Sequence, residues 1–337
     1  MRTVCLQKPP DGSACPRIGP GIIGMGEGQL KFNIKKIYNL WRNRDFLLFL
    51  AIILGLLAGE GARWTENIVI PALALVMTLS TMGVPGSIFH TPRTLVVPAL
   101  VGLAMNYGIL SSLLWGLNIL LVQEEVLSTG FIIMVAVPPA VAVIPFSVLL
   151  NGNVNFSLVA TIGCYLGALA ITPAITIGLL GSGFFDPGKL MTIMVELILG
   201  PLVLSRILRR SGLSGRIDPL KGAITNWSFF VVTYTIVGLN RAIILNRPLS
   251  LLPAAAIAVA STFLLGYLIE SAGRLFRLDT KTTTSLVLLG TQKNTGLAAG
   301  LALALFSEKT AVPATITTIF MIVHMIWLSL KMRRSHS

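Results

Sequence analysis

The chain has 337 residues, of which 54% are hydrophobic and 12% are charged, and its mean hydropathy is +0.82. This composition excludes a soluble globular domain and is typical of a polytopic membrane protein. The net charge of +13 would also fit a nucleic-acid-binding protein, but the basic residues lie mainly between hydrophobic runs, as topology signals do, so we expect no nucleic-acid partner.

The first 43 residues contain several prolines and a glycine-rich stretch, but no apolar run long enough for a signal peptide. This pattern predicts a disordered cytoplasmic tail, in which Met25 is an alternative start. A short second tail covers 332–337. The three cysteines of the chain are too few and too scattered for a disulfide framework or a metal site, so we expect neither a metal nor a cofactor.

Hydropathy divides residues 44–331 into ten apolar segments and predicts an all-α polytopic membrane protein. Several segments are long enough to cross a hydrocarbon core of about 30 Å. Segment 1 is the weakest, because its apolar part, 46–59, contains only fourteen residues. In chain order, segments 1 to 10 cover 44–61, 67–85, 94–121, 127–150, 154–180, 188–207, 224–244, 249–271, 283–305 and 311–331.

The distribution of lysine and arginine predicts the orientation of these segments. With the N-terminus in the cytoplasm, 20 of the 26 basic residues lie on the cytoplasmic side, five lie outside, and Lys293 lies within segment 9. Positive charge favours the cytoplasmic side, so we expect both termini in the cytoplasm and the protein in the plasma (inner) membrane. Arg206, Arg209 and Arg210 would stop segment 6 at this side, where contact with acidic lipids is open to them.

Ten segments form two groups of five, and an odd number of crossings inserts the second group in the opposite orientation, as in inverted-repeat transporters. Weak internal sequence similarity agrees with this plan, because 92–99 and 247–254 each contain two prolines and end in Pro-Ala. Segments 4 and 9 occupy the same place in each half, and both are interrupted, by three prolines within 137–145 and by three glycines within 290–300. Such paired interruptions predict a binding site near the bilayer midplane, at the two broken segments.

Lys293 stands in the second interruption, among the polar residues Gln292, Asn294 and Thr295. An ionisable side chain at bilayer depth is expensive unless it faces partners or a water-filled cavity, so this stretch is the main candidate site. Two roles are open for Lys293: a permanent structural cation, or a titrating group that couples transport to protons. Direct contact with an anionic substrate is compatible with either role.

Two further polar residues fall inside predicted segments. Glu196 is the only carboxylate well inside a segment, and we expect it at mid-depth, as a partner of Lys293 or part of a proton route; a position at the interface is the alternative. Asn106 in segment 3 would line a substrate path between the two domains of a transporter. Hydrogen bonding between helices is the alternative role, and it accounts for most polar residues inside membrane helices.

Four stretches occur in a characteristic order and spacing: MTLSTMGVPGSIFHTPR, PPAVAVIPFSVLLNGNVNFSLVATIG, ILGPLVLSRILRR and GTQKNTGLAAGLALALF. From about 46 to 331 the chain resembles the bile acid:sodium symporter family, in the superfamily of bile, arsenite and riboflavin-type transporters. The resemblance implies a panel domain of segments 1, 2, 6 and 7 and a core domain of segments 3–5 and 8–10. It also implies that helices 4 and 9 cross and that the two domains move relative to each other to give alternating access.

The departures from the family pattern fall on its two sodium sites. Val143 and Ile144 stand where the family has a Ser-Asn pair, while Leu289 replaces a glutamate and Lys293 replaces a glutamine. Sodium needs several oxygen ligands, and two unit charges 4 Å apart repel by about 4 kcal/mol at an effective dielectric of 20. We therefore expect no sodium partner, with Lys293 standing where the cation did.

Other positions of the sodium sites are kept. Ser157 and Thr161, four residues apart on one helical face, match two hydroxyl ligands, and Asn294 matches a third position. Asn106 follows the place where the family has a glutamine. Whether the Lys293 nitrogen lies within about 4 Å of the Ser157 and Thr161 hydroxyls, a distance that allows direct polar contact, tests this replacement.

The sequence thus predicts a sodium-independent secondary transporter of small organic anions. Its substrate would lie at the crossing, where half-helix N-termini face a carboxylate or sulfonate and Val143, Ile144 and Asn294 form the walls and polar contacts. Two alternatives remain: a proton-coupled or uncoupled efflux carrier of the same fold, and a non-transporting membrane receptor or scaffold. We do not expect an enzyme, since no HExxH, GxSxG, P-loop or dinucleotide pattern occurs in a suitable context.

Overall fold

The computed structural model describes residues 43–82, 92–181, 183, 185–246 and 248–334. Every regular element within these residues is helical, and the described residues from Arg44 onward form one compact unit. The chain is an integral membrane protein in which seven helices of the described part are long and apolar enough to cross a membrane: Gly59–Met82, Leu95–Leu121, Val154–Leu180, Pro187–Arg210, Ser214–Leu239, Pro248–Leu275 and Lys309–Met332. Three shorter apolar helices cover Phe46–Leu57, Glu125–Ala136 and Thr295–Leu305.

The individual elements are shorter than these spans, because turns of other helix types interrupt several of them. Up to residue 181 the elements are α2 (Arg44–Leu57), η1 (Gly59–Gly61), α3 (Ala62–Thr65), η2 (Glu66–Ile68), α4 (Val69–Met82), α5 (Pro92–Leu103), η4 (Ala104–Leu110), α6 (Ser111–Leu121), α7 (Glu125–Ala136), α8 (Val143–Leu149) and α9 (Val154–Leu180). From residue 185 they are α10 (Pro187–Met194), η5 (Val195–Leu199), α11 (Gly200–Arg210), α12 (Ser214–Leu239), α13 (Arg241–Asn246), η6 (Pro248–Leu251), α14 (Leu252–Val259), η7 (Ala260–Leu264), α15 (Leu265–Leu275), α16 (Thr280–Thr291), α17 (Thr295–Leu305), η8 (Lys309–Ala311) and α18 (Val312–Arg334).

Side-chain caps start two of the long helices. The Asn153 side-chain oxygen accepts a hydrogen bond from the Phe156 backbone at 3.1 Å and so begins α9. Asp186 accepts from the Gly188 backbone at 2.8 Å, and Pro187 takes the first position of α10, where its missing N–H costs nothing. Both caps satisfy backbone donors that a helix leaves without a partner in its first turn.

Several predicted segment boundaries differ from the structure, most clearly at α12 and α2. The helix α12 begins at Ser214, not at 224, although its polar first part contains Pro219 and two glycines; hydropathy does not detect this polar part of the helix. The helix α2 ends at Leu57, and the rest of predicted segment 1 forms the glycine-containing turn η1. Residues 83–85, at the end of predicted segment 2, lie outside the described residues.

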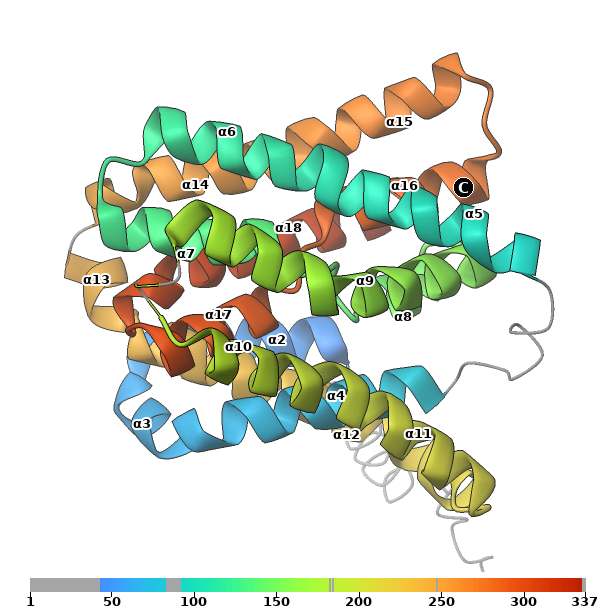
Figure 1. The fold of residues 1–337 in the computed structure, drawn as a ribbon, viewed down its shortest axis with the longest axis horizontal. Coiled ribbons are helices and arrows are strands. Elements are labelled where there is room, and N and C mark those ends of the chain that lie inside the picture. Colours follow the sequence, from blue (N-terminus) through green and yellow to red (C-terminus); the bar gives the residue numbers. More distant parts are fainter. Residues whose placement is uncertain (1–42, 83–91, 182, 184, 247, 335–337) are drawn as a thin grey trace, which may run out of the picture. The chain divides into compact units, whose positions relative to one another are not determined.

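The described helices form two groups (Figure 1). The first group is α2, α4 and α10–α12, in which α12 packs on α2 and α4, and α11 packs on α4. The second group is α5–α9 and α14–α18, in which α5 packs on α9, α6 on α7, α14 on α18 and α15 on α16. Figure 1 shows the first group in its lower part and most of the second group above it.

Three long helices contain a π-turn: η4 joins α5 to α6, η5 joins α10 to α11, and η7 joins α14 to α15. A π-turn closes hydrogen bonds between residues i and i+5, so it widens the helix by one residue and brings residues five apart onto one face. The turn η4 uses this property at the candidate site.

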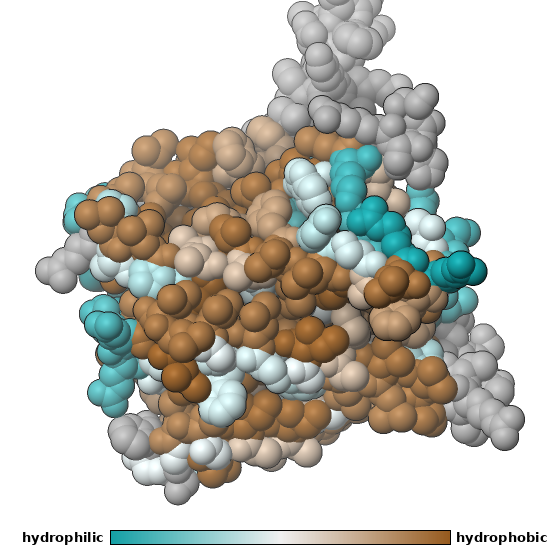
Figure 2. All heavy atoms as spheres, turned by 90° about the horizontal axis from the view of Figure 1, so that it is seen from above, coloured by the Kyte–Doolittle hydropathy of each residue, from teal (hydrophilic) through white to brown (hydrophobic). Residues whose placement is uncertain are grey.

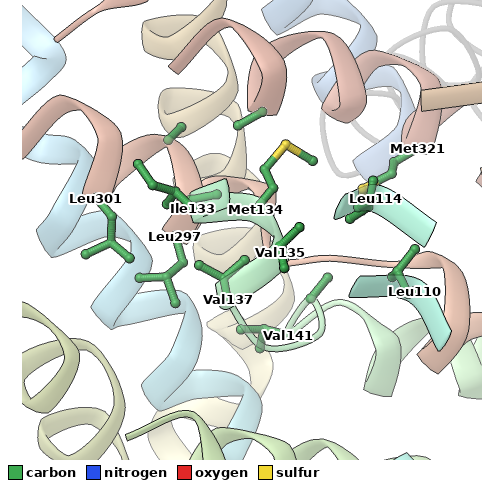
Figure 3. Close-up of a cluster of buried hydrophobic side chains, with 14 of the residues drawn as sticks. Leu110, Leu114, Ile133, Met134, Val135, Val137, Val141, Leu297, Leu301 and Met321 are labelled. Atoms are coloured by element: carbon green, nitrogen blue, oxygen red, sulfur yellow. The ribbon is translucent and has the colours of Figure 1, made fainter. Parts of the chain in front are cut away.

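Apolar side chains cover most of the face seen in Figure 2, and hydrophilic residues gather mainly toward its left and right ends. Such a surface suits a protein whose middle faces acyl chains and whose ends face water and headgroups. Inside, Leu297 and Leu301 of α17 lie beside Ile133 and Val137 at the end of α7 (Figure 3). This apolar packing holds the two interrupted helices against each other.

Candidate functional site

The two interrupted helices meet at their interruptions. Residues 137–142 separate α7 from α8, and residues 292–294 separate α16 from α17. The two stretches pair in antiparallel fashion through two backbone hydrogen bonds of 2.9 Å, from Ala140 N to Gln292 O and from Asn294 N to Pro138 O. Each interruption therefore supplies backbone partners for the other, which non-helical backbone inside a membrane requires.

Local sequence explains both interruptions. Pro138 and Pro139 have no backbone N–H and clash with the preceding turn, which ends α7, whereas Pro145 stands in the first turn of α8, where a proline is tolerated. On the other side, the Asn294 side-chain oxygen accepts from the Leu297 backbone at 3.0 Å and starts α17 as its N-cap.

The Lys293 side chain is only 1% exposed. Its Nζ donates to four oxygens: Asn106 Oδ1 at 2.8 Å, Ser111 Oγ at 2.8 Å, Val135 O at 3.1 Å and Val137 O at 2.7 Å. The Tyr107 ring also faces it, with 4.7 Å between Nζ and the ring centroid, within the range of cation–π attraction. The side chain thus joins the second interruption to η4, α6 and the end of α7.

All four oxygens act as acceptors toward Nζ. The Asn106 amide nitrogen donates to the Leu289 carbonyl at 3.3 Å, so its oxygen faces Lys293, and the Ser111 hydroxyl donates to the Val135 carbonyl at 2.6 Å. A neutral amine would point its lone pair at one of these oxygens, so the arrangement fits the protonated ammonium. Burial of an ammonium costs several kcal/mol, and hydrogen bonds to a charged group, each contributing about 1.5–3 kcal/mol, offset that cost. Among the described residues, no carboxylate is bonded to this nitrogen.

The π-turn η4 brings Asn106 and Ser111 to the same ammonium. Five residues turn a regular α-helix by about 500°, which would leave these two side chains about 140° apart. The wider turn aligns them, and the Ser111 hydroxyl also lies 3.1 Å from the Asn106 carbonyl. The sequence predicts Asn106 as a site residue but not Ser111. Ser111 reaches the site only because of the π-turn, and no residue pattern in the sequence predicts that turn.

Asn294 and Tyr165 connect the two interruptions. The Asn294 side-chain nitrogen donates to the Tyr165 hydroxyl at 3.0 Å, and this hydroxyl donates to the Pro139 carbonyl at 2.8 Å. Tyr165 comes from α9 and is buried. It is another site residue that sequence reasoning missed, since a tyrosine within an apolar helix carries no signal beyond packing.

Gln292 and Thr295 contact α18 on the other side of the interruption. Gln292 is buried and its side-chain nitrogen lies 3.4 Å from the His324 Nδ1. The Thr295 hydroxyl accepts from the Thr318 hydroxyl at 2.7 Å. Three successive side chains, from Gln292 to Asn294, therefore turn toward three different helices.

Among the described residues, Lys293 makes no hydrogen bond to Ser157 or Thr161. The Ser157 hydroxyl pairs with Ser147 of α8 at 2.5 Å, while the buried Thr161 hydroxyl has no hydrogen-bond partner among the described residues. The nitrogen instead bonds to oxygens of η4, α6 and the end of α7.

Val143 and Ile144 also lie apart from the ammonium. Val143 is fully buried at the start of α8, and Ile144 is half-buried against Leu158 and Ile162 of α9. Neither residue lines the cavity described below.

The predicted partnership of Glu196 with Lys293 is also not found. Glu196 lies in η5 and is exposed, whereas its neighbours Leu197 and Ile198 fill the inward face of that turn. Its side chain therefore faces away from the packed interior.

A cavity of about 100 Å³ lies beside the second interruption, between the two helix groups. Residues 292–296 and Thr233 and Thr318 give it a polar wall, and none of the four oxygens that hold the ammonium lines it. The remaining lining is apolar and comes from both groups: Leu48, Leu73, Val76, Ala140, Val141, Ala142, Phe146, Phe229, Val232, Ile236, Met321, Ile322 and Met325. The apolar lining with a few polar groups is typical of ligand pockets, although this cavity is smaller than the roughly 300–1,000 Å³ that such pockets have.

Comparisons with models of known protein families and with curated proteins find no match to this chain.

Proposed function

We propose that the chain is a secondary transporter of small organic anions that works without sodium, with the Lys293 ammonium in the place of a bound cation. The observation that carries the proposal is the position of this ammonium, held by four oxygens where two interrupted helices meet, next to a cavity between two helix groups. Paired interruptions around a binding site are a recurring plan of secondary transporters. The sequence resemblance to the bile acid:sodium symporter family points to the same class.

The transporter would have ten helices in two inverted repeats. α7 with α8, and α16 with α17, each count as one interrupted crossing, and α2 is a short first crossing. Landmarks of the first half recur 155 residues later: α7 ends at Ala136 and α16 at Thr291, and Pro98 in α5 corresponds to Pro253 in α14. The π-turns η4 and η7 fall in corresponding places. Figure 1 supports the inversion, since α5–α6 and α14–α15 run in opposite directions.

The two helix groups support a panel and a core within 44–331. The first group contains helices of predicted segments 1, 2, 6 and 7, and the second group contains those of segments 3–5 and 8–10. Because the cavity is lined by both groups, relative movement of the groups would open it to one side of the membrane and then to the other. Cytoplasmic termini and a plasma-membrane location belong to the same proposal.

The substrate would contact the start of α17 and leave the ammonium untouched. The three hydrogens of the Nζ ammonium are already shared among four oxygens, so a salt bridge to the substrate would require breaking this arrangement. Asn294, Thr295 and Gly296 line the cavity at the N-terminus of α17, where the helix dipole favours a carboxylate or sulfonate.

The alternative functions differ in whether transport is coupled to protons and in whether transport occurs at all. The four acceptors around Nζ favour a permanent cation, and thus an uncoupled carrier, over a lysine that releases a proton in each cycle. A non-transporting receptor of the same fold would bind an anion in the same cavity without moving it.

Counterflow in proteoliposomes tests the proposal. The full chain is reconstituted, and entry of radiolabelled carboxylates and sulfonates, taurocholate included, is followed with sodium or choline outside and with or without a proton gradient. We expect saturable exchange that is equal in sodium and choline. Exchange stimulated by sodium would contradict the proposal, dependence on the proton gradient would assign proton coupling, and binding without flux of any anion would identify a receptor.

A further inference from the structure

A second hollow lies on the surface between α9 and α11. It is a groove of about 390 Å³, and none of its lining residues is acidic or contributes to the lysine site: Ile162, Leu166, Leu202, Val203, Arg206, Ile207 and Arg210. The groove forms because α11 packs on α4 of the first group, while the start of the same long helix, at α10, packs on α9 of the second group. Figure 1 shows α11 leading away from α9.

The groove has an apolar part and a basic end. Along α11, Leu202 and Val203 come first, and Arg206 and Arg210 follow four residues apart on one helical face. The apolar span Pro187–Arg210 ends at this second arginine, so the basic end falls at a boundary of the membrane-crossing part. The order along the helix is that of a lipid, with acyl chains toward the bilayer centre and the headgroup at its edge.

Exposure of the apolar part distinguishes a lipid from a free anion. Leu166 is 50% exposed, Val203 is 57% exposed and Ile207 is 56% exposed. These aliphatic side chains lie within spans that cross the membrane, where acyl chains cover them. A small soluble anion would use the arginines alone and leave this part of the groove empty.

We propose that the groove binds one anionic glycerophospholipid. Its phosphate lies between the Arg206 and Arg210 guanidinium groups, which present paired N–H donors that match phosphate oxygens. One acyl chain runs along Val203 and Leu166. Because α9 and α11 belong to different helix groups, the bound lipid bridges the two groups at the membrane edge. The proposal does not depend on transport.

Lipid retention by the full-length protein tests this site. The chain is purified in detergent, incubated with equal amounts of phosphatidylglycerol and phosphatidylcholine, and examined by native mass spectrometry. We expect one retained phosphatidylglycerol on the unaltered protein, and retention at least about tenfold weaker on Arg206→Gln/Arg210→Gln, a factor equivalent to about 1.4 kcal/mol. The control Arg274→Gln/Arg277→Gln removes the same charge at exposed residues outside the groove and should retain the lipid as the unaltered protein does.

A second variant fills the groove and keeps both arginines. Val203→Trp is expected to lose the retained phosphatidylglycerol, and it tests the site even where the arginine variant does not fold. Equal retention of the two lipids, unchanged retention by the arginine variant or by Val203→Trp, or complete displacement of the lipid by millimolar inorganic phosphate would each overturn the proposal.

Discussion

The oxygens around the Lys293 ammonium resemble the shell of a monovalent metal ion: one amide oxygen, one hydroxyl and two backbone carbonyls. They all come from residues 106–137, in η4, α6 and the end of α7, more than 150 positions before Lys293. Without a positive charge at their centre, the carbonyls of Val135 and Val137 would lose a donor inside the protein. An unsatisfied buried acceptor costs about 1–3 kcal/mol, so the cation also helps to hold the junction together.

Lys293→Ala should leave a space that a small cation can fill. We expect the variant to have a lower Tm than the unaltered protein, and millimolar methylammonium to raise that Tm by several degrees, because a ligand that binds the folded state stabilises it. Tetramethylammonium, which cannot donate hydrogen bonds, should have no effect. Lys281→Ala, at an exposed lysine, is the matched control. A variant as stable as the unaltered protein would refute the structural role of the charge.

Ser111 offers a finer test of the same arrangement. Ser111→Ala removes one acceptor of the ammonium and one donor to the Val135 carbonyl, so we expect a loss of about 1–3 kcal/mol in the free energy of unfolding. Ser112→Ala is the control, since the neighbouring hydroxyl is exposed. Thermal unfolding in detergent should separate the two variants by several degrees, and equal Tm values would contradict the assignment of Ser111 to the site.

The limits of sequence reasoning are clear at these residues. Lys293 stands out because a charge in an apolar run has few structural explanations, and Asn106 stands out as a polar residue in a predicted span. Backbone carbonyls such as that of Val135 have no sequence signature. The predicted partnership of Glu196 with Lys293 rested on the position of Glu196 along the chain, which does not tell which face of η5 turns inward.

At the scale of helices, α5 and α9 approach each other closely along small residues. A Cβ added at Gly163 of α9 would lie 2.5 Å from the Ala99 Cβ and 3.0 Å from its Cα, closer than real contacts allow. The glycine is therefore required by packing, since its own backbone is ordinary helix. Small residues at helix contacts replace the hydrophobic driving force that is missing inside a bilayer.

Gly163→Ala should lower the stability of the protein although alanine is the better helix former. The added methyl group must push α5 away, at a cost of about 1–3 kcal/mol. Gly178→Ala in the same helix is the control, because nothing lies within 4 Å of a Cβ there, and it should be neutral or stabilising by up to about 1 kcal/mol. Thermal unfolding compares the two, and a Gly163→Ala variant as stable as Gly178→Ala would show that the helices are packed less closely.

Elements differ in how far the sequence predicts them. The interruption after α7 follows directly from Pro138 and Pro139, and most segment positions follow from hydropathy. The early start of α12 at Ser214 does not follow from hydropathy, because hydropathy locates the apolar part of a helix and not the residue at which the helix begins. The π-turns η4 and η7 lie in long apolar runs without proline at the turn, so their presence depends on packing that a sequence pattern does not express.

At the scale of the molecule, the cavity is lined by both helix groups, which also contact each other directly. One contact joins Gly296 at the start of α17 to Leu73 of α4, where an added Cβ would lie 2.9 Å from the Leu73 Cδ2. On the proposed function, α4 and α17 must slide or separate here for the cavity to change sides.

A cross-link between these groups should therefore stop transport. In a chain without Cys5, Cys15 and Cys164, Leu73→Cys/Gly296→Cys joined by a short bis-methanethiosulfonate, which forms a disulfide with each thiol, should lose anion counterflow and regain it when those disulfides are reduced. Each single-cysteine variant serves as the control for the effect of the substitution. Full flux in the cross-linked protein would mean that the two groups do not move against each other at this contact.

The covalent attachment of the ammonium has an electrical consequence. A cation that belongs to the chain is never released on either side, so, on the proposed function, an uncoupled carrier of this design draws nothing from ionic gradients. The membrane voltage then acts on the net charge that crosses, at about 2.3 kcal/mol per elementary charge per 100 mV. With a negative interior, such a carrier drives a monovalent anion outward, up to a ratio of about fiftyfold at that voltage.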